Sequence, residues 1–148
     1  MAGSGTDLAQ AATDLIEAFN QADWERFRGL LASGAVYTET GTGRRVEGAG
    51  AYLQLVQGWK EAFPDVTGTI RHKVVSGDTA AQEILWEGTH TRPMQTPAGT
   101  LEPTGQRISV EASVWMRFEE GLVREVHHYL DVLVVLQQIG AIPTEAAA

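Results

Sequence analysis

The last third of the sequence alternates apolar and polar side chains, as two long β-strands joined by a tight turn do. Glu120-Gly121 offers a two-residue hairpin loop with a glycine available for positive φ. If this loop joins the strands, Phe118 faces Val123, and Val110 lies opposite Asp131. Asp131 would then point toward the apolar face of the sheet, whereas a bulge in the hairpin would reverse its direction.

The residues before these strands predict helices first and strands afterwards. Apolar residues recur at helical spacing over 6–19, 24–31 and 49–63, and Asp23 is placed to cap the second helix. Strands are expected at 36–40, 67–75, 79–91, 107–118 and 122–130, and a short closing helix at 132–139. This order predicts an α+β fold, in which a strongly curved antiparallel sheet wraps around the helices and leaves an internal apolar pocket.

Composition limits the classes of function. With 148 residues the chain predicts a single domain, 1–148, whose ends at 1–5 and 144–148 we expect to be flexible. The net charge of −8 and the lack of a basic run argue against nucleic acid as a partner. No cysteine, no signal-peptide pattern and no membrane-length apolar stretch is present, which predicts a cytoplasmic protein that does not bind membranes.

Short motifs distributed along the second half of the chain resemble those of the SnoaL-like polyketide cyclases, within the nuclear transport factor two-like superfamily. In order, they are Ala62-Phe63-Pro64-Asp65, Gly77-Asp78, Gly88-Thr89-His90-Thr91, Pro103-Thr104-Gly105, Arg117-Phe118 with Gly121, Glu125, Asp131 and Gln137-Gln138-Ile139-Gly140. The set spans about 80 residues. After the glycine, the family pattern continues His-Thr-Gly-Pro-Phe, whereas this chain has Arg92-Pro93-Met94, which places an arginine near the rim of the pocket.

The resemblance implies a cone-shaped α+β barrel and a cofactor-free enzyme. In such an enzyme the aspartate at the position of Asp131 acts as general acid/base in an aldol-type ring closure of a hydrophobic, polyketide-like carbonyl substrate. Isomerisation is the related reaction. The superfamily also holds epoxide hydrolases, hydroxylases and binding domains, so a carboxylate-assisted hydrolase or hydratase and a non-catalytic small-molecule-binding domain remain alternatives.

The catalytic candidates follow from the strand that ends at Asp131. A carboxylate desolvated at the inner end of an apolar strand is a stronger base, although Asp131 could instead cap the last helix. His127 shares its face and could donate to an enolate, or could be a buried histidine bonded to a carbonyl. His128 is expected on the outer face, and His90 is a second donor candidate at the end of a long strand. No His-x-His or Glu-x-x-His spacing occurs, so no metal site is predicted.

Aromatic residues supply the candidate pocket wall and one candidate interface. Trp59 and Phe63 are the first choice for contact with substrate, because their helix leads to the Phe-Pro-Asp motif. Trp115 stands among short polar residues on the outer sheet face, which suggests a homodimer through that face, or else an ordinary solvated surface. The other residues expected to touch substrate are Tyr37, Tyr52, Met94 and Tyr129.

Overall fold

The computed structural model describes residues 5–96 and 99–142. Three helices lie in the first part of the described chain, and one pair of strands, a long one and a short one, stands between the second and third helix. The elements are α1 (Gly5–Asn20), α2 (Trp24–Gly29), β1 (Leu31–Thr40), β2 (Arg44–Glu47), α3 (Ala49–Ala62), β3 (Thr67–Ser76), β4 (Thr79–Thr89), β5 (Met94–Thr96), β6 (Gly99–Leu101), β7 (Arg107–Glu119), β8 (Leu122–Leu130) and α4 (Val132–Gln138).

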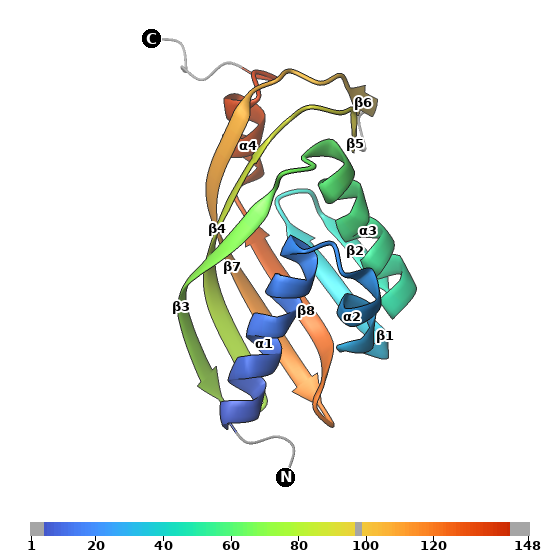
Figure 1. Cartoon of the computed structure of the whole chain (residues 1–148), viewed down its shortest axis with the longest axis vertical. Coiled ribbons are helices and arrows are strands. Elements are labelled where there is room, and N and C mark those ends of the chain that lie inside the picture. The colour runs from blue at the N-terminus through green and yellow to red at the C-terminus, as the bar shows by residue number, and fades with distance from the viewer. Residues whose placement is uncertain (1–4, 97–98, 143–148) are drawn as a thin grey trace.

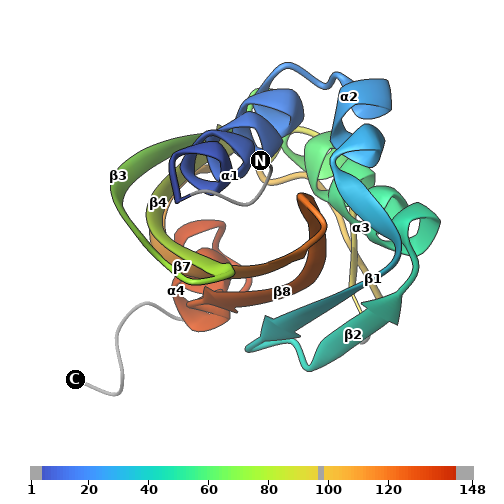
Figure 2. The same cartoon turned by 90° about the horizontal axis from the view of Figure 1, so that it is seen from below.

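The main sheet contains six strands in the order β2-β1-β8-β7-β4-β3. It curls around α1 and α3, which lie on its concave side, while α4 closes one end (Figures 1 and 2). The predicted α+β fold with helices on a strongly curved sheet is therefore confirmed. One part of the prediction is wrong: β1 runs parallel to β8, so the sheet is mixed and not purely antiparallel. A parallel pair needs a long connection, and here residues 41–121, more than half of the chain, provide it.

The hairpin between β7 and β8 has the predicted loop and an unpredicted bulge. Glu120 and Gly121 both have positive φ, and Phe118 pairs with Val123 as expected. The next pairing, however, is Arg117 with Glu125, so one extra residue is inserted in β8. Beyond this bulge the side chains of β8 exchange faces relative to the regular alternation.

The interior combines the concave face of the sheet with the apolar stripes of α1 and α3. Asp23 caps α2 as predicted, since its side chain accepts a hydrogen bond from the backbone N–H of Arg26. The aspartate of the Phe-Pro-Asp motif has a structural role that we call the Asp65 clamp: its side chain accepts hydrogen bonds from the backbone N–H and the hydroxyl of Thr89. This clamp ties the end of α3 to the end of β4, and it requires close approach, because a Cβ at Gly88 would lie 3.0 Å from the backbone of Val66.

The observed elements differ from the expected boundaries in three places. β1 begins at Leu31, before the expected strand 36–40. β2 lies between that strand and the third helix, where no strand was expected, and the short strands β5 and β6 pair between the expected strands 79–91 and 107–118. Of the residues expected to be flexible, 1–4 and 144–148 lie outside the described residues, whereas Gly5 begins α1. No helix in the described part of the chain is long and apolar enough to cross a membrane.

Candidate functional site

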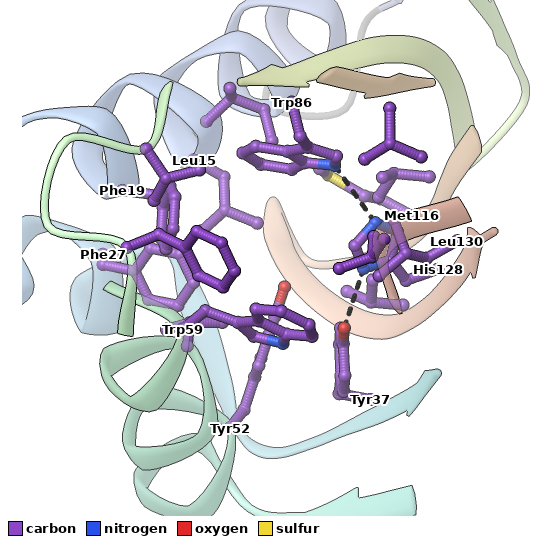
Figure 3. A pocket seen from close by; sticks show the side chains of 18 of the residues that line it. Leu15, Phe19, Phe27, Tyr37, Tyr52, Trp59, Trp86, Met116, His128 and Leu130 are labelled. Atoms are coloured by element: carbon purple, nitrogen blue, oxygen red, sulfur yellow. Dashed lines mark hydrogen bonds between the residues drawn. The ribbon is translucent and has the colours of Figure 1, made fainter. Parts of the chain in front are cut away.

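An apolar cavity lies between the helices and the concave face of the sheet (Figure 3). Its volume is about 70 Å³, room for roughly five water molecules, so a larger ligand requires lining side chains to move. Four aromatic residues predicted as pocket wall, Tyr37, Tyr52, Trp59 and Phe63, do line it. The other lining residues are Leu15, Ile16, Phe19, Phe27, Val56, Val66, Trp86, Ile108, Val110, Val114, Met116, Val126, His128, Leu130 and Val135.

His128 belongs to this apolar wall, and its ring lies between two aromatic side chains. Its side chain is only 9% exposed, and Figure 3 shows the ring between Tyr37 and Trp86. The Tyr37 hydroxyl lies 2.8 Å from Nδ1, and the indole N–H of Trp86 donates to Nε2 at 3.2 Å. The bulge in β8 turns His128 inward, because without it the alternation would place His128 on the outer face.

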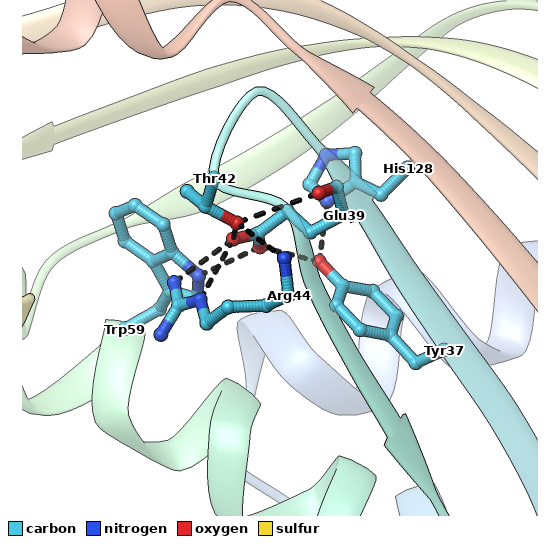
Figure 4. Close-up of polar contacts among 6 residues, drawn as sticks. All are labelled: Tyr37, Glu39, Thr42, Arg44, Trp59 and His128. Carbon is cyan, nitrogen blue, oxygen red and sulfur yellow. Dashed lines mark hydrogen bonds and ion pairs between the residues drawn. The ribbon is translucent and has the colours of Figure 1, made fainter. Parts of the chain in front are cut away.

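Behind Tyr37 lies a fully buried carboxylate, Glu39 (Figure 4). Arg44 donates to its Oε1 from Nε at 3.1 Å and from Nη2 at 2.9 Å, and the Thr42 hydroxyl donates to the same oxygen at 2.8 Å. The other oxygen, Oε2, accepts from the Tyr37 hydroxyl at 2.6 Å and from the Trp59 indole N–H at 3.2 Å. Both oxygens are therefore satisfied, as a buried carboxylate requires.

The turn between β1 and β2 makes this cluster. Tyr37 and Glu39 lie on the same face of β1, and Thr42 and Arg44 return from the turn to the same carboxylate. Gly41 stands at φ 107°, and a Cβ there would lie 2.8 Å from the carbonyl oxygen of Leu130. A glycine is thus required for the turn to pack against the end of β8.

Burial and hydrogen bonds set the ionisation of these groups. Burial lowers the pKa of His128 from 6.5 to about 4, opposed by the charge of Glu39, so the imidazole is neutral at pH 7. Burial by itself raises the pKa of Glu39, but hydrogen bonds from Tyr37 and Thr42 and the charge of Arg44 outweigh it and lower the pKa. Burial, followed by Glu39, raises the pKa of Tyr37, which stays protonated.

Tyr52 provides a second polar atom in the cavity. Its ring stacks on that of Tyr37, with centroids 4.6 Å apart, and its hydroxyl points into the cavity (Figure 3). Among the described residues this hydroxyl has no hydrogen-bond partner. Burial and the nearby Glu39 raise the pKa of Tyr52, which therefore remains a donor at all ordinary pH values.

Trp86 fits above the cavity because Gly68 leaves space for its indole. A Cβ at position 68 would lie 2.5 Å from Cζ3 of Trp86, a distance at which the indole would have to shift. The indole also contacts Phe19 edge to face, with ring centroids 5.4 Å apart. These neighbours hold the N–H of Trp86 toward His128.

The predicted inward direction of Asp131 and His127 is wrong, and the bulge is the reason. Ala112 pairs with Leu130, which excludes the predicted position of Val110 opposite Asp131. Asp131 is exposed, and it caps α4 by accepting the backbone N–H of Val134 at 3.2 Å. His127 lies on the outer face, 3.9 Å from the carboxylate of Glu125. Tyr129 is 47% exposed on the same face, where it lines an outer hollow of about 380 Å³ together with Asp131. None of the three side chains reaches the cavity.

The remaining predicted residues lie close to the cavity wall without lining it. His90 is buried, stacks on Phe63 with centroids 5.2 Å apart and accepts the backbone N–H of Thr104 at Nδ1, while its Nε2 has no partner among the described residues. Burial lowers its pKa. Met94 lines a separate outer hollow of about 550 Å³, which also contains Arg44, Arg92 and Trp59. Trp59 thus separates that hollow from the cavity.

Sequence reasoning missed His128, Glu39, Arg44 and Trp86. A signal for Glu39 existed, because Tyr37 and Glu39 share one face of a strand expected to be half buried. In the described part of the chain no group of three or more histidine, aspartate and glutamate side chains gathers as a metal site would require. The polar side chains that line the cavity are the imidazole of His128, the phenols of Tyr37 and Tyr52, and the indoles of Trp59 and Trp86.

Comparison with known proteins finds one family and many structures of the same fold. A family model described as SnoaL-like polyketide cyclase matches residues 9–139. A presumed SnoaL-like polyketide cyclase from Jannaschia Sp. CCS1 superposes with a TM-score of 0.85 at 20% identity, over 97% of this chain and 98% of that chain. AclR from Streptomyces galilaeus, a presumed hydroxylase, superposes with a TM-score of 0.82 at 22% identity, over 97% of this chain and 87% of that chain. IdmH from Streptomyces antibioticus, a presumed polyketide cyclase, superposes with a TM-score of 0.76 at 28% identity, over 90% of this chain and 98% of that chain. A search of curated proteins finds no match.

Proposed function

The chain belongs to the SnoaL-like polyketide cyclase family, and on that premise we propose that it is a cofactor-independent acid/base enzyme acting on a hydrophobic carbonyl compound. The reaction is an aldol-type cyclisation or the related isomerisation. His128 is its general acid/base, in the role that the sequence had suggested for Asp131. The observation that carries the proposal is a neutral imidazole in the wall of a largely apolar cavity, with its Nε2 accepting the indole N–H of Trp86.

The donors beside His128 suit the charge that forms in such a reaction. His128 Nε2 takes a proton from the carbon between two carbonyl groups, and the electrons of the C–H bond move to a carbonyl oxygen. The resulting enolate oxygen accepts the hydroxyl proton of Tyr52 in a hydrogen bond. In the free protein the indole N–H of Trp86 occupies the lone pair of Nε2, so it has to move off Nε2 before the proton is taken, and it is then a second donor for that oxygen.

The second half of the reaction returns the proton. The enolate carbon attacks another carbonyl carbon of the same molecule, a C–C bond forms, and the alkoxide takes the proton from Nε2 of His128. The product is a cyclic β-hydroxy ketone, and the enzyme is unchanged. In isomerisation the same proton returns to a different carbon of the substrate.

The strength of the base limits the substrate class. With a pKa of about 4, His128 is a weak base, so the C–H bond that it breaks must be an acidic one. A CH₂ group flanked by two carbonyls, as in a poly-β-ketone chain, meets this requirement. The aromatic and aliphatic lining favours a substrate whose remaining surface is apolar.

The other classes make different use of the same cavity. For a binding domain without chemistry, the capping role of Asp131 is expected, but a buried imidazole in the cavity wall would only weaken the binding of an apolar ligand. For a hydrolase, His128 would activate water; a structure described as an epoxide hydrolase from M.tuberculosis shares the fold at 14% identity, a likeness that concerns the fold alone.

The test uses two probes without any added cofactor. The first is an aryl 1,3-diketone that carries a third ketone placed so that ring closure gives a six-membered ring, with the cyclised product measured by chromatography and mass spectrometry. The second is styrene oxide, with the diol as the product. We expect cyclisation of the diketone, lost in His128→Asn. Diol formation alone would favour the hydrolase, and the absence of both reactions would contradict an enzymatic role.

We also propose that the protein forms a homodimer through the outer face of β3, β4, β7 and β8. Trp115 is 47% exposed there, between charged pairs of both signs, Arg71 with Glu111 and Arg117 with Glu125. A face with both signs of charge around one large aromatic residue can pair with a second copy of itself across a two-fold axis.

A further inference from the structure

The network behind His128 contains two side chains, Tyr37 and Glu39, to which the proposed reaction gives no step. Glu39 is fully buried and holds hydrogen bonds from four side chains, including the guanidinium of Arg44. Burying a carboxylate is costly, and a purely structural interior position is usually filled by an apolar side chain. The position of this charge, one phenol away from the imidazole, therefore calls for an explanation.

The direction of each hydrogen bond in the network is determined from its two ends. At the inner end, an indole N–H can only donate, so Nε2 of His128 must be the acceptor of the bond from Trp86. A neutral imidazole then carries its proton on Nδ1. At the outer end, Arg44 and Thr42 keep Glu39 ionised, so the short 2.6 Å contact requires the Tyr37 hydroxyl to donate to Glu39.

With its single proton given to Glu39, the Tyr37 oxygen can only accept from Nδ1–H of His128, at 2.8 Å. The two independent constraints agree. The chain of donors runs from His128 Nδ1–H to Tyr37 and from Tyr37 O–H to Glu39, and it leaves Nε2 as the basic nitrogen that faces the cavity.

We infer that Glu39, acting through Tyr37, is a positioning residue that fixes His128 in the Nδ1–H tautomer and stabilises its protonated form during turnover. The inference rests on the proposed function for its catalytic part, whereas its tautomer part concerns the free protein. When Nε2 takes a proton, every bond of the relay keeps its direction, because Nδ1–H still donates to Tyr37. The positive charge of the imidazolium then faces the carboxylate across one neutral phenol.

The groups around His128 support this assignment of roles. The phenols Tyr37 and Tyr52 stay neutral, and Arg44 is bonded to Glu39 and not to the imidazole. Glu39 is the charge that acts on His128, and it does so in the direction that favours the protonated ring. Loss of Glu39 would therefore weaken the base, and loss of the Tyr37 hydroxyl would leave Nδ1–H without its acceptor.

The experiment reads the tautomer directly, by ¹⁵N NMR of histidine-labelled protein in wild type, Tyr37→Phe and Glu39→Gln. We expect wild-type His128 to carry its proton on Nδ1. Tyr37→Phe should give a mixture of tautomers, because Nδ1–H loses its acceptor and only the indole N–H of Trp86 then favours the Nδ1–H form. Tyr52→Phe is the matched control, because it removes the hydroxyl of the stacked partner ring, which does not contact His128. The control should leave the tautomer unchanged, although it should lower turnover.

Turnover of the aryl diketone supplies the second readout. Both relay variants should lower kcat by about tenfold or more with little change in KM, as loss of a charge-assisted hydrogen bond predicts. In Glu39→Gln the acidic limb of the pH profile should also move to lower pH. An unchanged tautomer and pH profile in both variants would overturn the relay and leave the proposed function intact. A tautomer change without any wild-type turnover would contradict the proposed function and the catalytic part of the relay, and support the tautomer part.

Discussion

His127 and His128 are neighbours in one strand and have opposite environments. His127 lies on the convex face beside Glu125, and its side chain is 44% exposed. His128 lies on the concave face, buried between a phenol and an indole. The same side chain is thus an ordinary solvated residue at one position and a neutral base in an apolar wall at the next. The comparison teaches that the face of the sheet, and not the residue type, decides which histidine can do chemistry.

A one-residue bulge in β8 determines which of the two histidines faces the cavity. The extra residue near Arg124 reverses the faces of everything that follows in β8, including Tyr129 and the capping residue Asp131. The predictions below test whether the inner and outer faces differ as the structure indicates, beginning with the largest effect.

The largest difference is expected in catalysis. His128→Asn removes the base from the cavity, and turnover of the aryl diketone should fall by about 10²–10⁴-fold, the usual contribution of a general acid/base. His127→Asn is the matched control on the outer face and should keep activity near that of wild type. Equal losses in the two variants would remove the distinction between the faces.

The second difference appears in the pH dependence of stability. An imidazole with a folded pKa of about 4 and an unfolded value near 6.5 remains neutral in the folded state while the unfolded chain takes up a proton. The free energy of unfolding should therefore fall as pH drops below about 6.5, by about 2 kcal/mol between pH 7 and pH 5 for this group. Urea titrations at both pH values should show a smaller fall in His128→Asn than in wild type. An equal fall in wild type and His128→Asn would contradict a buried, neutral imidazole at this position.

The third prediction concerns the convex face alone. Trp115→Lys should weaken self-association at least tenfold, as expected for loss of a central interface tryptophan, about 2 kcal/mol. Sedimentation velocity at micromolar concentration measures it. Gln54→Lys adds the same charge on α3, on the helical side of the molecule, and should leave association unchanged. A monomeric wild type would exclude the dimer.

The smallest effect is expected at Asp131. Asp131→Ala removes the cap of α4 and should cost about 1 kcal/mol of stability, with turnover retained. Asp131→Asn preserves the cap and should be close to wild type in both respects. A loss of activity in a folded Asp131→Asn protein would return this carboxylate to the mechanism and contradict the outer position assigned to it.

The sequence predicted most of the fold because its main signals are local. Helical spacing, alternation and the cap at Asp23 are readable from a few residues. The bulge was not readable, because Arg124 and Glu125 are both polar and either could be the extra residue on the outer face. The parallel pairing of β1 with β8 and the buried Glu39 depend on residues far apart in sequence, and a strand pattern does not specify its neighbour.

The parallel pairing of β1 with β8 also has a consequence for biosynthesis. His128 and Tyr37 are separated by 91 positions, so the two sides of the relay meet only after β8 has left the ribosome. Before that point a nascent chain can form α1, α2, α3 and the β3–β4 hairpin, whose contacts are local, but Glu39 has no imidazole to act on. The acid/base centre is therefore assembled only when β8 joins β1 to β7, and a chain cut before β8 would lack both a central strand of the sheet and the imidazole.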